Sequence, residues 1–190
     1  MPVPKNPAAD EPRQLIRDVA YTRIRDEILN GQLEPGERLN DDELTAWLQV
    51  SRTPIREAIA KLAADGLIEM APNRYTRIPK RSPEAYARAA EYMHMIRGFV
   101  IAHLDRVPAQ ELTTTRTQMS KLLPRLREHD RDAQLQFNDE FGELAALIGN
   151  PLIQDAEQRV RSQAQFHLQH EDSIIDWHGI VTHAETITNS

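Results

Sequence analysis

The string VSRTPIREAI at residues 50–59 restricts what this chain can fold into more than any other stretch of it. Ser51 or Thr53 can cap a helix start by accepting backbone N–H groups, and Pro54 suits the first turn, where a missing N–H costs nothing. Apolar residues then recur at helical spacing, at Ile55, Ile59 and Leu62. We therefore predict a helix that begins near Ser51 and buries one face.

Two arginines lie beside this apolar stripe. Arg52 and Arg56 are four residues apart, so they project to one side of the helix, near its N-terminus. Forked guanidinium groups at a helix start suit guanine edges and phosphates in a DNA major groove. The alternative is an ordinary solvated face, because charged side chains are common on helix surfaces.

The flanking sequence favours the DNA-contacting interpretation. Upstream, Asn40 and Glu43 form a capping box that opens a short helix over residues 41–48, and very few residues join it to the next helix. Downstream, Gly66 stands in a C-cap position, and residues 67–78 alternate like two strands around a central turn. The order of helix, turn, helix and basic hairpin predicts a winged helix-turn-helix.

These residues closely resemble the DNA-binding domain of GntR-family transcriptional regulators. The resemblance runs from about Leu15 to Ile78 and is carried by LEPGERL at residues 33–39, the string at 50–59 and DGLI at 65–68. It implies a homodimer that binds a palindromic operator in double-stranded DNA. On this basis we expect DNA contacts from Arg38, Ser51, Arg52, Thr53, Arg56, Asn73, Arg74 and Arg77.

Two positions depart from the family pattern. The distribution of charge along the chain is a separate indication of where it would contact DNA. Asp42 stands where the family often has an arginine, and Tyr75 stands where the wing usually has a glycine. The net charge of −6 argues against indiscriminate nucleic-acid binding, but residues 50–81 contain seven basic and three acidic side chains, a local +4. An acidic body with one basic patch suits a protein that contacts phosphates in one place.

The chain divides into three expected parts. Residues 1–12 are expected to be a disordered arm, residues 13–79 the DNA-binding domain, and residues 80–190 an all-helical effector-binding and dimerisation domain. The fold class is thus mainly α: three helices with a β-hairpin wing, then an all-α helical bundle. Helical patterns in the second domain span residues 83–107, 108–129, 132–148, 151–170 and 177–186.

Two further expectations concern individual helices. Pro124 should kink or shorten the second helix of the all-helical domain. The opening helix of the first domain, at residues 14–30, is amphipathic and stops at an Asn-Gly pair. The side chains that it should bury are Leu15, Ile16, Val19, Ile24 and Ile28.

The second domain resembles the helical FCD domain of the fatty-acid-regulator-like branch of the family, at Phe141, Leu144 and residues 149–152. In that domain an Asp and a His four residues apart, with two later histidines, commonly hold a divalent metal beside a carboxylate effector. Here the Asp position falls on Asn138 and the His position on Gly142, so we expect no metal and no other cofactor. A small organic effector, with a carboxylate as the favoured class, is expected at Arg97, Asn138, Gly142 and His178.

Several classes of protein are disfavoured. There is no cysteine, no apolar run near the ~18 residues of a membrane span and no signal-peptide pattern, which favours a cytoplasmic protein without a membrane partner. No hydrolase, phosphate-loop or zinc-protease motif is present, so we expect a regulator, typically a repressor, rather than an enzyme. Two alternatives stay open. One is a helical ligand-binding or interaction module whose winged domain no longer reads DNA, and the other is a metal-dependent enzyme that uses the C-terminal histidines.

Overall fold

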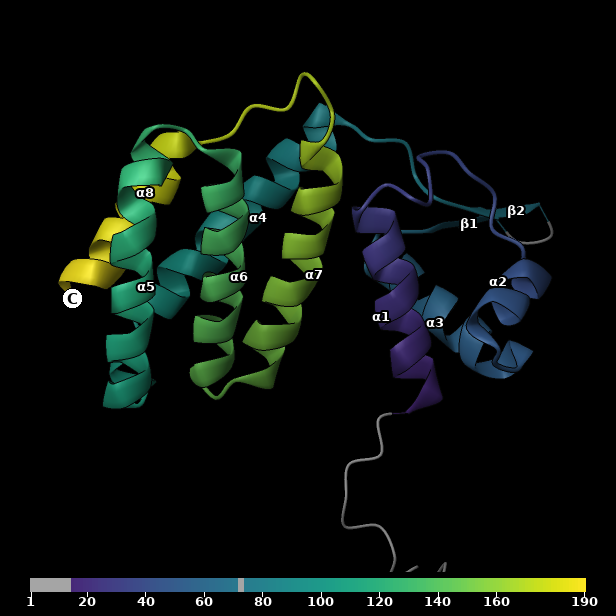
Figure 1. The fold of residues 1–190 in the computed structure, drawn as a ribbon, viewed down its shortest axis with the longest axis horizontal. Coiled ribbons are helices and arrows are strands. Elements are labelled where there is room, and N and C mark those ends of the chain that lie inside the picture. The colour runs from purple at the N-terminus through teal and green to yellow at the C-terminus, as the bar shows by residue number, and fades with distance from the viewer. Residues whose placement is uncertain (1–14, 72–73) are drawn as a thin grey trace, which may run out of the picture. The chain divides into compact units, whose positions relative to one another are not determined.

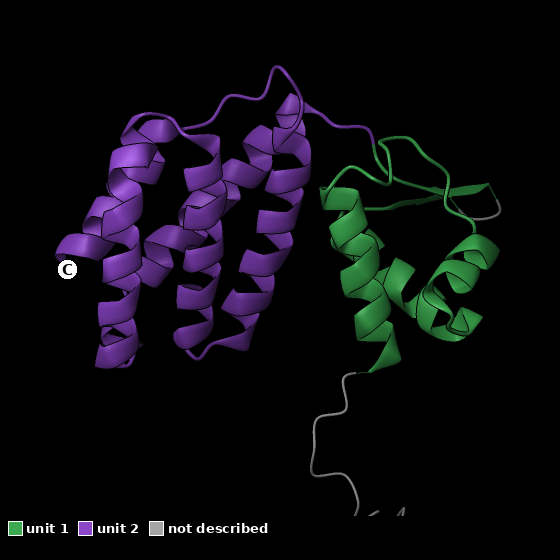
Figure 2. Ribbon diagram, in the orientation of Figure 1, with its two compact units in different colours: residues 1–79 green, residues 80–190 purple. Residues whose placement is uncertain are grey.

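The computed structural model describes residues 15–71 and 74–190, which fall into two compact units divided between residues 79 and 80 (Figures 1 and 2). The expected arm at residues 1–12 and the wing-tip residue Asn73 lie outside the described residues.

The first unit has the predicted order of elements (Figure 1). Its helices are α1 (Ile16–Leu29), α2 (Asp41–Leu48) and α3 (Arg52–Ala64), followed by strands β1 (Glu69–Ala71) and β2 (Tyr75–Arg77). The strands are antiparallel, with Met70 opposite Thr76, and an isolated bridge joins Arg38 to Arg77. The predicted winged helix-turn-helix is therefore confirmed.

The core of the first unit lies between α1 and α3, which are in extensive contact. Ile24, Ile28, Ile55 and Leu62 are fully buried there. The Tyr21 hydroxyl donates a hydrogen bond of 2.7 Å to the buried Asp65 carboxylate, just beyond the end of α3. These contacts hold α3 by one face and leave its opposite face exposed.

The prediction for α1 is partly wrong. Ile24 and Ile28 are buried as expected, but the first turn of the helix is not, since Leu15, Ile16 and Val19 are 50%, 60% and 41% exposed. The buried side chains of α1 lie farther along the helix, from Ala20 onwards, where it packs on α3. Helical periodicity shows which apolar residues share one face of a helix. It does not show how much of that face is buried against other elements.

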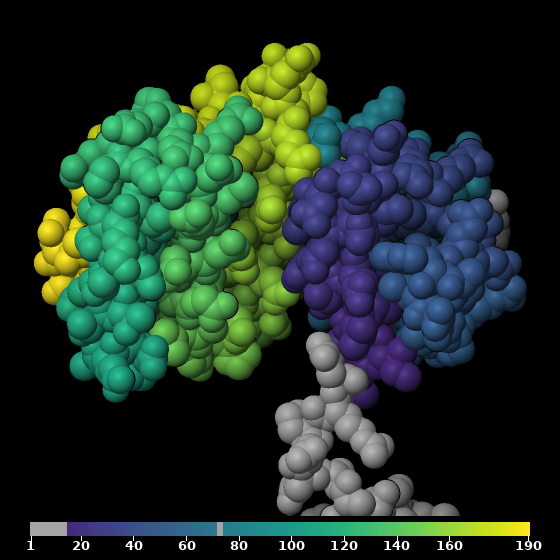
Figure 3. Space-filling model, viewed as in Figure 1, coloured from purple at the N-terminus to yellow at the C-terminus, as the bar shows by residue number. Residues whose placement is uncertain are grey.

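The second unit is the all-α bundle that the sequence predicts. Its helices are α4 (Pro83–Ile101), α5 (Ala109–Arg127), α6 (Arg131–Leu147), α7 (Pro151–Leu168) and α8 (Trp177–Asn189), with a 3-10 turn η1 (Leu104–Arg106). The largest helix contacts are α4 with α7 and α5 with α8. Side chains fill the spaces between the ribbons of α5, α6 and α7 (Figure 3), and Phe137 and Phe141 of α6 are fully buried.

Two helix ends differ from the sequence-based expectation. α4 ends at Ile101 rather than near Val107, because the His103 ring stacks on Phe99 and its Nδ1 lies 2.7 Å from the Phe99 carbonyl oxygen. This contact occupies a carbonyl near the helix end. α5 is not shortened at Pro124, since the proline lies in the last turn and its carbonyl still accepts from the Glu128 N–H. Within the described ranges, no helix is long and apolar enough to cross a bilayer.

Candidate nucleic-acid interface

The start of α3 presents four predicted contact residues on one exposed surface. Ser51, Arg52, Thr53 and Arg56 are all exposed, whereas the opposite face of the helix is buried in the core. Ser51 occupies the N-cap position with an extended backbone, and its hydroxyl makes no capping hydrogen bond in the structure. That hydroxyl and the first N–H groups of the helix are therefore available to an anion such as a phosphate.

Both arginines at this helix start form ion pairs with the preceding helix. The Arg52 Nη2 atom lies 2.6 Å from Asp42 Oδ1, and the Arg56 Nε atom lies 2.8 Å from Asp41 Oδ2. The Asn40 side chain caps α2 by accepting from the Asp42 N–H, and this fixes the turn that carries both aspartates. Neither ion pair was predicted from the sequence, where Asp42 stood only as a departure from the family pattern.

The predicted wing residues differ in how they are engaged. The Arg77 side chain donates to Glu69 at 2.8 Å across the two strands and lies over the Tyr75 ring at 4.4 Å, so it is held within the hairpin. Arg74 and Arg38 are exposed. Tyr75, which replaces the usual glycine, thus provides a surface on which an arginine stacks.

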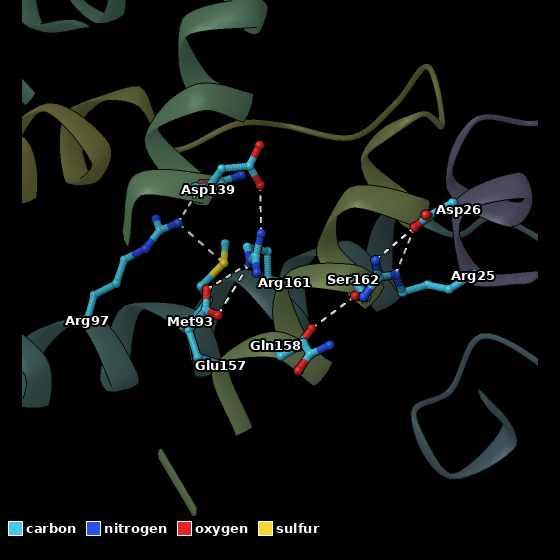
Figure 4. Close-up of polar contacts among 10 residues, drawn as sticks. Arg25, Asp26, Met93, Arg97, Asp139, Glu157, Gln158, Arg161 and Ser162 are labelled. Carbon is cyan, nitrogen blue, oxygen red and sulfur yellow. Dashed lines mark hydrogen bonds and ion pairs between the residues drawn. The ribbon is translucent and has the colours of Figure 1, made fainter. Parts of the chain in front are cut away.

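The helical unit contains a buried arginine. Arg97 of α4 is 3% exposed and lies over the rings of Phe137 and Phe141, at 4.9 and 5.4 Å. Its Nη2 donates to the Asn138 side-chain oxygen at 2.6 Å. The same atom contacts the Met93 sulfur at 3.4 Å (Figure 4). Burial lowers the pKa of Arg97 to about 10, so the guanidinium still carries its charge at neutral pH.

Next to Arg97 is a small cavity of about 30 Å³, whose walls are mostly apolar with several polar side chains among them. Three buried polar atoms in these walls have no hydrogen-bond partner among the described residues: Arg97 Nε, Gln134 Oε1 and His183 Nδ1. Leaving such groups unpaired costs free energy, so the cavity is suited to a small polar ligand that pairs with them. Its other polar residues are Tyr86, His94 and Asp176.

The four predicted effector residues do not converge on this cavity. Arg97 lines it and Asn138 holds Arg97, whereas His178 is exposed on α8 and is not part of the lining. His183, five residues farther along α8 and therefore on a different face of the helix, lines the cavity instead. His183 was not among the predicted effector residues, because the sequence does not indicate which of the C-terminal histidines face inward.

The residues around Gly142 do not fit a metal site. A Cβ atom at Gly142 would lie 2.9 Å from Arg161 Nη2, so a guanidinium already occupies the space beside that backbone. Arg161 forms ion pairs with Asp139 at 2.6 Å and with Glu157 at 3.1 Å (Figure 4). The Asn138 side-chain oxygen accepts a hydrogen bond from Arg97. No three His, Cys, Asp or Glu side chains in the described ranges are grouped to hold a metal ion.

The buried His183 predicts a dependence of stability on pH. Desolvation lowers its pKa from 6.5 to about 4 in the folded chain. The unfolded chain therefore takes up this proton first, and stability should fall as the pH drops from about 6.5 towards 4, by ~2 kcal/mol after allowance for solvent screening. Urea unfolding as a function of pH measures the effect.

Two variants test the assignment of that pH dependence. His183→Gln should flatten the slope between pH 4 and 6.5, whereas His178→Gln, on the exposed side of the same helix, should leave it unchanged. An unchanged slope in His183→Gln would assign the dependence elsewhere. His167 is the clearest alternative, since desolvation lowers its pKa as well.

Comparison with known proteins relates this chain to a family of regulators. The family model described as "Bacterial regulatory proteins, gntR family" matches residues 16–78. A transcriptional regulator from the unstable DNA locus of Streptomyces ambofaciens is 34% identical over 50% of this chain and 38% of its own length. The regulator YdhC of Bacillus subtilis is 30% identical over 65% of this chain and 56% of its own. The Escherichia coli repressor RspR is 37% identical over 37% and 31%.

The chain thus spans less than two thirds of the length of these relatives, which are regulators and not enzymes. Among solved structures, McbR/YncC of E. coli is similar with a TM-score of 0.63 at 18% identity, over 92% of this chain and 94% of that one. A GntR regulator from Rhodococcus sp. RHA1 has a TM-score of 0.60 at 19% identity, over 89% and 83%. At these identities the two structures support the fold alone.

Proposed function

The first unit of this chain belongs to the GntR family of bacterial regulatory proteins, and from that premise we propose that the chain is a sequence-specific transcriptional regulator that binds a palindromic operator as a homodimer. The observation that supports this most directly is the start of α3, where Ser51, Arg52, Thr53 and Arg56 share one exposed surface. Arginines on such a surface can read guanine edges, and hydroxyls can bind phosphates.

The proposed contacts divide into two kinds. Arg52 and Arg56 read base edges in the major groove, while Ser51, Thr53 and the N-terminal N–H groups of α3 bind the phosphate backbone. Arg38 and Arg74 add positive charge near the hairpin, and Asn73 beside Arg74 would reach the minor groove. In a dimer, the two recognition helices would enter successive major grooves about 34 Å apart, one helical turn of DNA.

The effector is proposed to bind beside Arg97 in the helical unit. Among the described residues, the Arg97 side chain hydrogen-bonds only to a neutral amide and a thioether, and the buried Glu157 carboxylate is the main opposite charge that acts on it. A buried guanidinium is costly, and a small anion would add to this compensation. A monocarboxylate fits this description, and the unpaired atoms of Gln134 and His183 would complete its hydrogen bonding. Binding would alter operator affinity only if the anion binds the two states of the dimer unequally.

A fluorescence-anisotropy titration tests the DNA-binding proposal. The purified chain is titrated into the intergenic duplex beside its own gene at two salt concentrations, with random duplex as competitor. We expect saturable binding that survives the competitor, two protomers per duplex, and a log–log salt slope of about −0.9 for each phosphate contact. Binding that the competitor abolishes would contradict the proposal and favour a helical interaction module whose winged unit does not read sequence.

A further inference from the structure

We propose that Asp41 and Asp42 determine the DNA specificity of this chain in two different ways. Asp41 positions Arg56 for guanine recognition, whereas Asp42 competes with DNA for Arg52. This inference rests on the proposed DNA-binding function and concerns the two ion pairs that join the first turn of α2 to the start of α3. The two pairs look alike, but they engage different atoms of the two guanidinium groups.

Asp41 binds the inner edge of its arginine. Its Oδ2 atom accepts from the Arg56 Nε at 2.8 Å, and the two terminal amino groups of that arginine have no hydrogen-bond partner in the described parts of the chain. Two parallel N–H donors at the end of a guanidinium match the O6 and N7 acceptors of guanine. Asp41 is about one third exposed, and its partner Arg56 is 68% exposed. The carboxylate therefore holds a flexible side chain in one direction before DNA arrives, which reduces the entropy lost on binding.

Asp42 binds the outer edge of its arginine. Its Oδ1 atom lies 2.6 Å from Arg52 Nη2, one of the terminal amino groups that a guanine would need. With one N–H of this amino group directed at Asp42, a single N–H of the group remains for a base, so the carboxylate and a guanine compete for Arg52. Both side chains are more than 60% exposed, and an exposed pair of this kind is weak enough for DNA to displace.

The carboxylate of Asp42 also acts on DNA directly. It lies in the first turn of α2, where a helix N-terminus would otherwise attract a phosphate. A carboxylate there repels the phosphates of any duplex, whatever its sequence. Only a duplex whose guanines contact Arg52 and Arg56 offsets this loss of binding free energy. Asp42 should therefore weaken binding to random DNA more than binding to the operator, and so raise the specificity ratio.

The test compares two duplexes across four variants. A 30-bp duplex is first selected from a random library with the wild-type chain, and anisotropy then gives Kd for that duplex and for random DNA. The variants are Asp41→Ala, Asp41→Asn, Asp42→Asn and Glu43→Gln. The last is the matched control, because it removes one negative charge from an exposed side chain of the same helix turn.

Each aspartate has its own expected result. Asp41→Ala should weaken binding to the selected duplex by about tenfold, and it should not weaken binding to random DNA, because it also removes a negative charge from the first turn of α2. Replacing guanine in the selected duplex by 7-deazaguanine, which lacks the N7 acceptor, should weaken the binding of the Asp41→Ala chain by a smaller factor than the binding of the wild-type chain. Asp41→Asn keeps a hydrogen-bond acceptor but not the charge, so its Kd for the selected duplex should lie between those of the wild-type chain and Asp41→Ala. Asp42→Asn should tighten both complexes, random DNA by the larger factor, beyond any change in Glu43→Gln.

Other outcomes would overturn the inference. They also distinguish a failure of the inference alone from a failure of the proposed DNA-binding function. Equal losses by Asp41→Ala on both duplexes, or unchanged sensitivity to 7-deazaguanine, would show that Asp41 does not position a guanine reader. Matching Kd values for Asp42→Asn and Glu43→Gln would remove the role of Asp42. If the wild-type chain enriches no duplex, the proposed function itself fails, and the inference fails with it.

Discussion

Replacing both Arg52 and Arg56 by alanine is expected to reduce operator affinity to that for random DNA. Each arginine is expected to contribute about 1–3 kcal/mol through contacts to base edges, so together they account for most of the discrimination. The two side chains are four residues apart on one helix face and share the DNA as partner, so the loss in the double variant need not equal the sum of the single losses. Anisotropy titrations of the single and double variants against selected and random duplexes measure these losses directly.

The same substitutions should leave the fold intact. Both arginines are more than 60% exposed, and an exposed ion pair contributes only about 0–1 kcal/mol to stability. The matched control is Arg17→Ala, which removes an exposed, ion-paired arginine from α1 in the same unit. Kd values for the double variant equal to those of wild type, with the control also unchanged, would show that α3 does not read DNA.

The first unit could be predicted closely because its signals are local. Asn40 caps α2, and Ser51 and Pro54 stand at the start of α3 where they were predicted, so the helix bounds follow from these residues. The capping hydrogen bond predicted for Ser51 was wrong, since its side chain accepts no N–H group of the helix. The buried stripe of α3 was also correct, since Ile55, Ile59 and Leu62 all lie in the core. Each of these features depends on residues within one or two turns of one another, which is the range over which sequence patterns are informative.

The contacts that matter for function were not predictable in the same way. The pairing of Arg56 with Asp41 spans 15 residues, and Gly142 meets Arg161 of the next helix. Such contacts depend on how two helices are packed, which local periodicity does not specify. The orientation of His183 into the cavity, with His178 left exposed, depends on the rotation of α8 against the bundle.

The largest effect expected in the helical unit comes from removing Arg97 together with its partner Asn138. The double substitution Arg97→Met/Asn138→Leu replaces a buried charge and a buried amide by apolar groups of similar volume. Exchanges of this kind are often neutral or stabilising, and we expect a gain of about 1–3 kcal/mol in the free energy of unfolding. Arg97→Met alone should gain less, because Asn138 then keeps a buried oxygen without its donor. Urea unfolding of the three chains measures both effects.

The same double variant should lose the response to anions. Acetate is the probe: it should raise the unfolding midpoint of the wild-type chain in proportion to the logarithm of its concentration, once that exceeds Kd. It should not raise the midpoint of the double variant, although that variant starts from higher stability. Arg88→Met, on the exposed side of α4, is the matched control and should respond like wild type.

A double variant that is less stable than wild type would show that Arg97 is a structural residue. An equal acetate response in wild type and double variant would place the anion elsewhere. Higher stability together with a lost response would mean that the chain keeps a destabilising charge in its core because a ligand requires it.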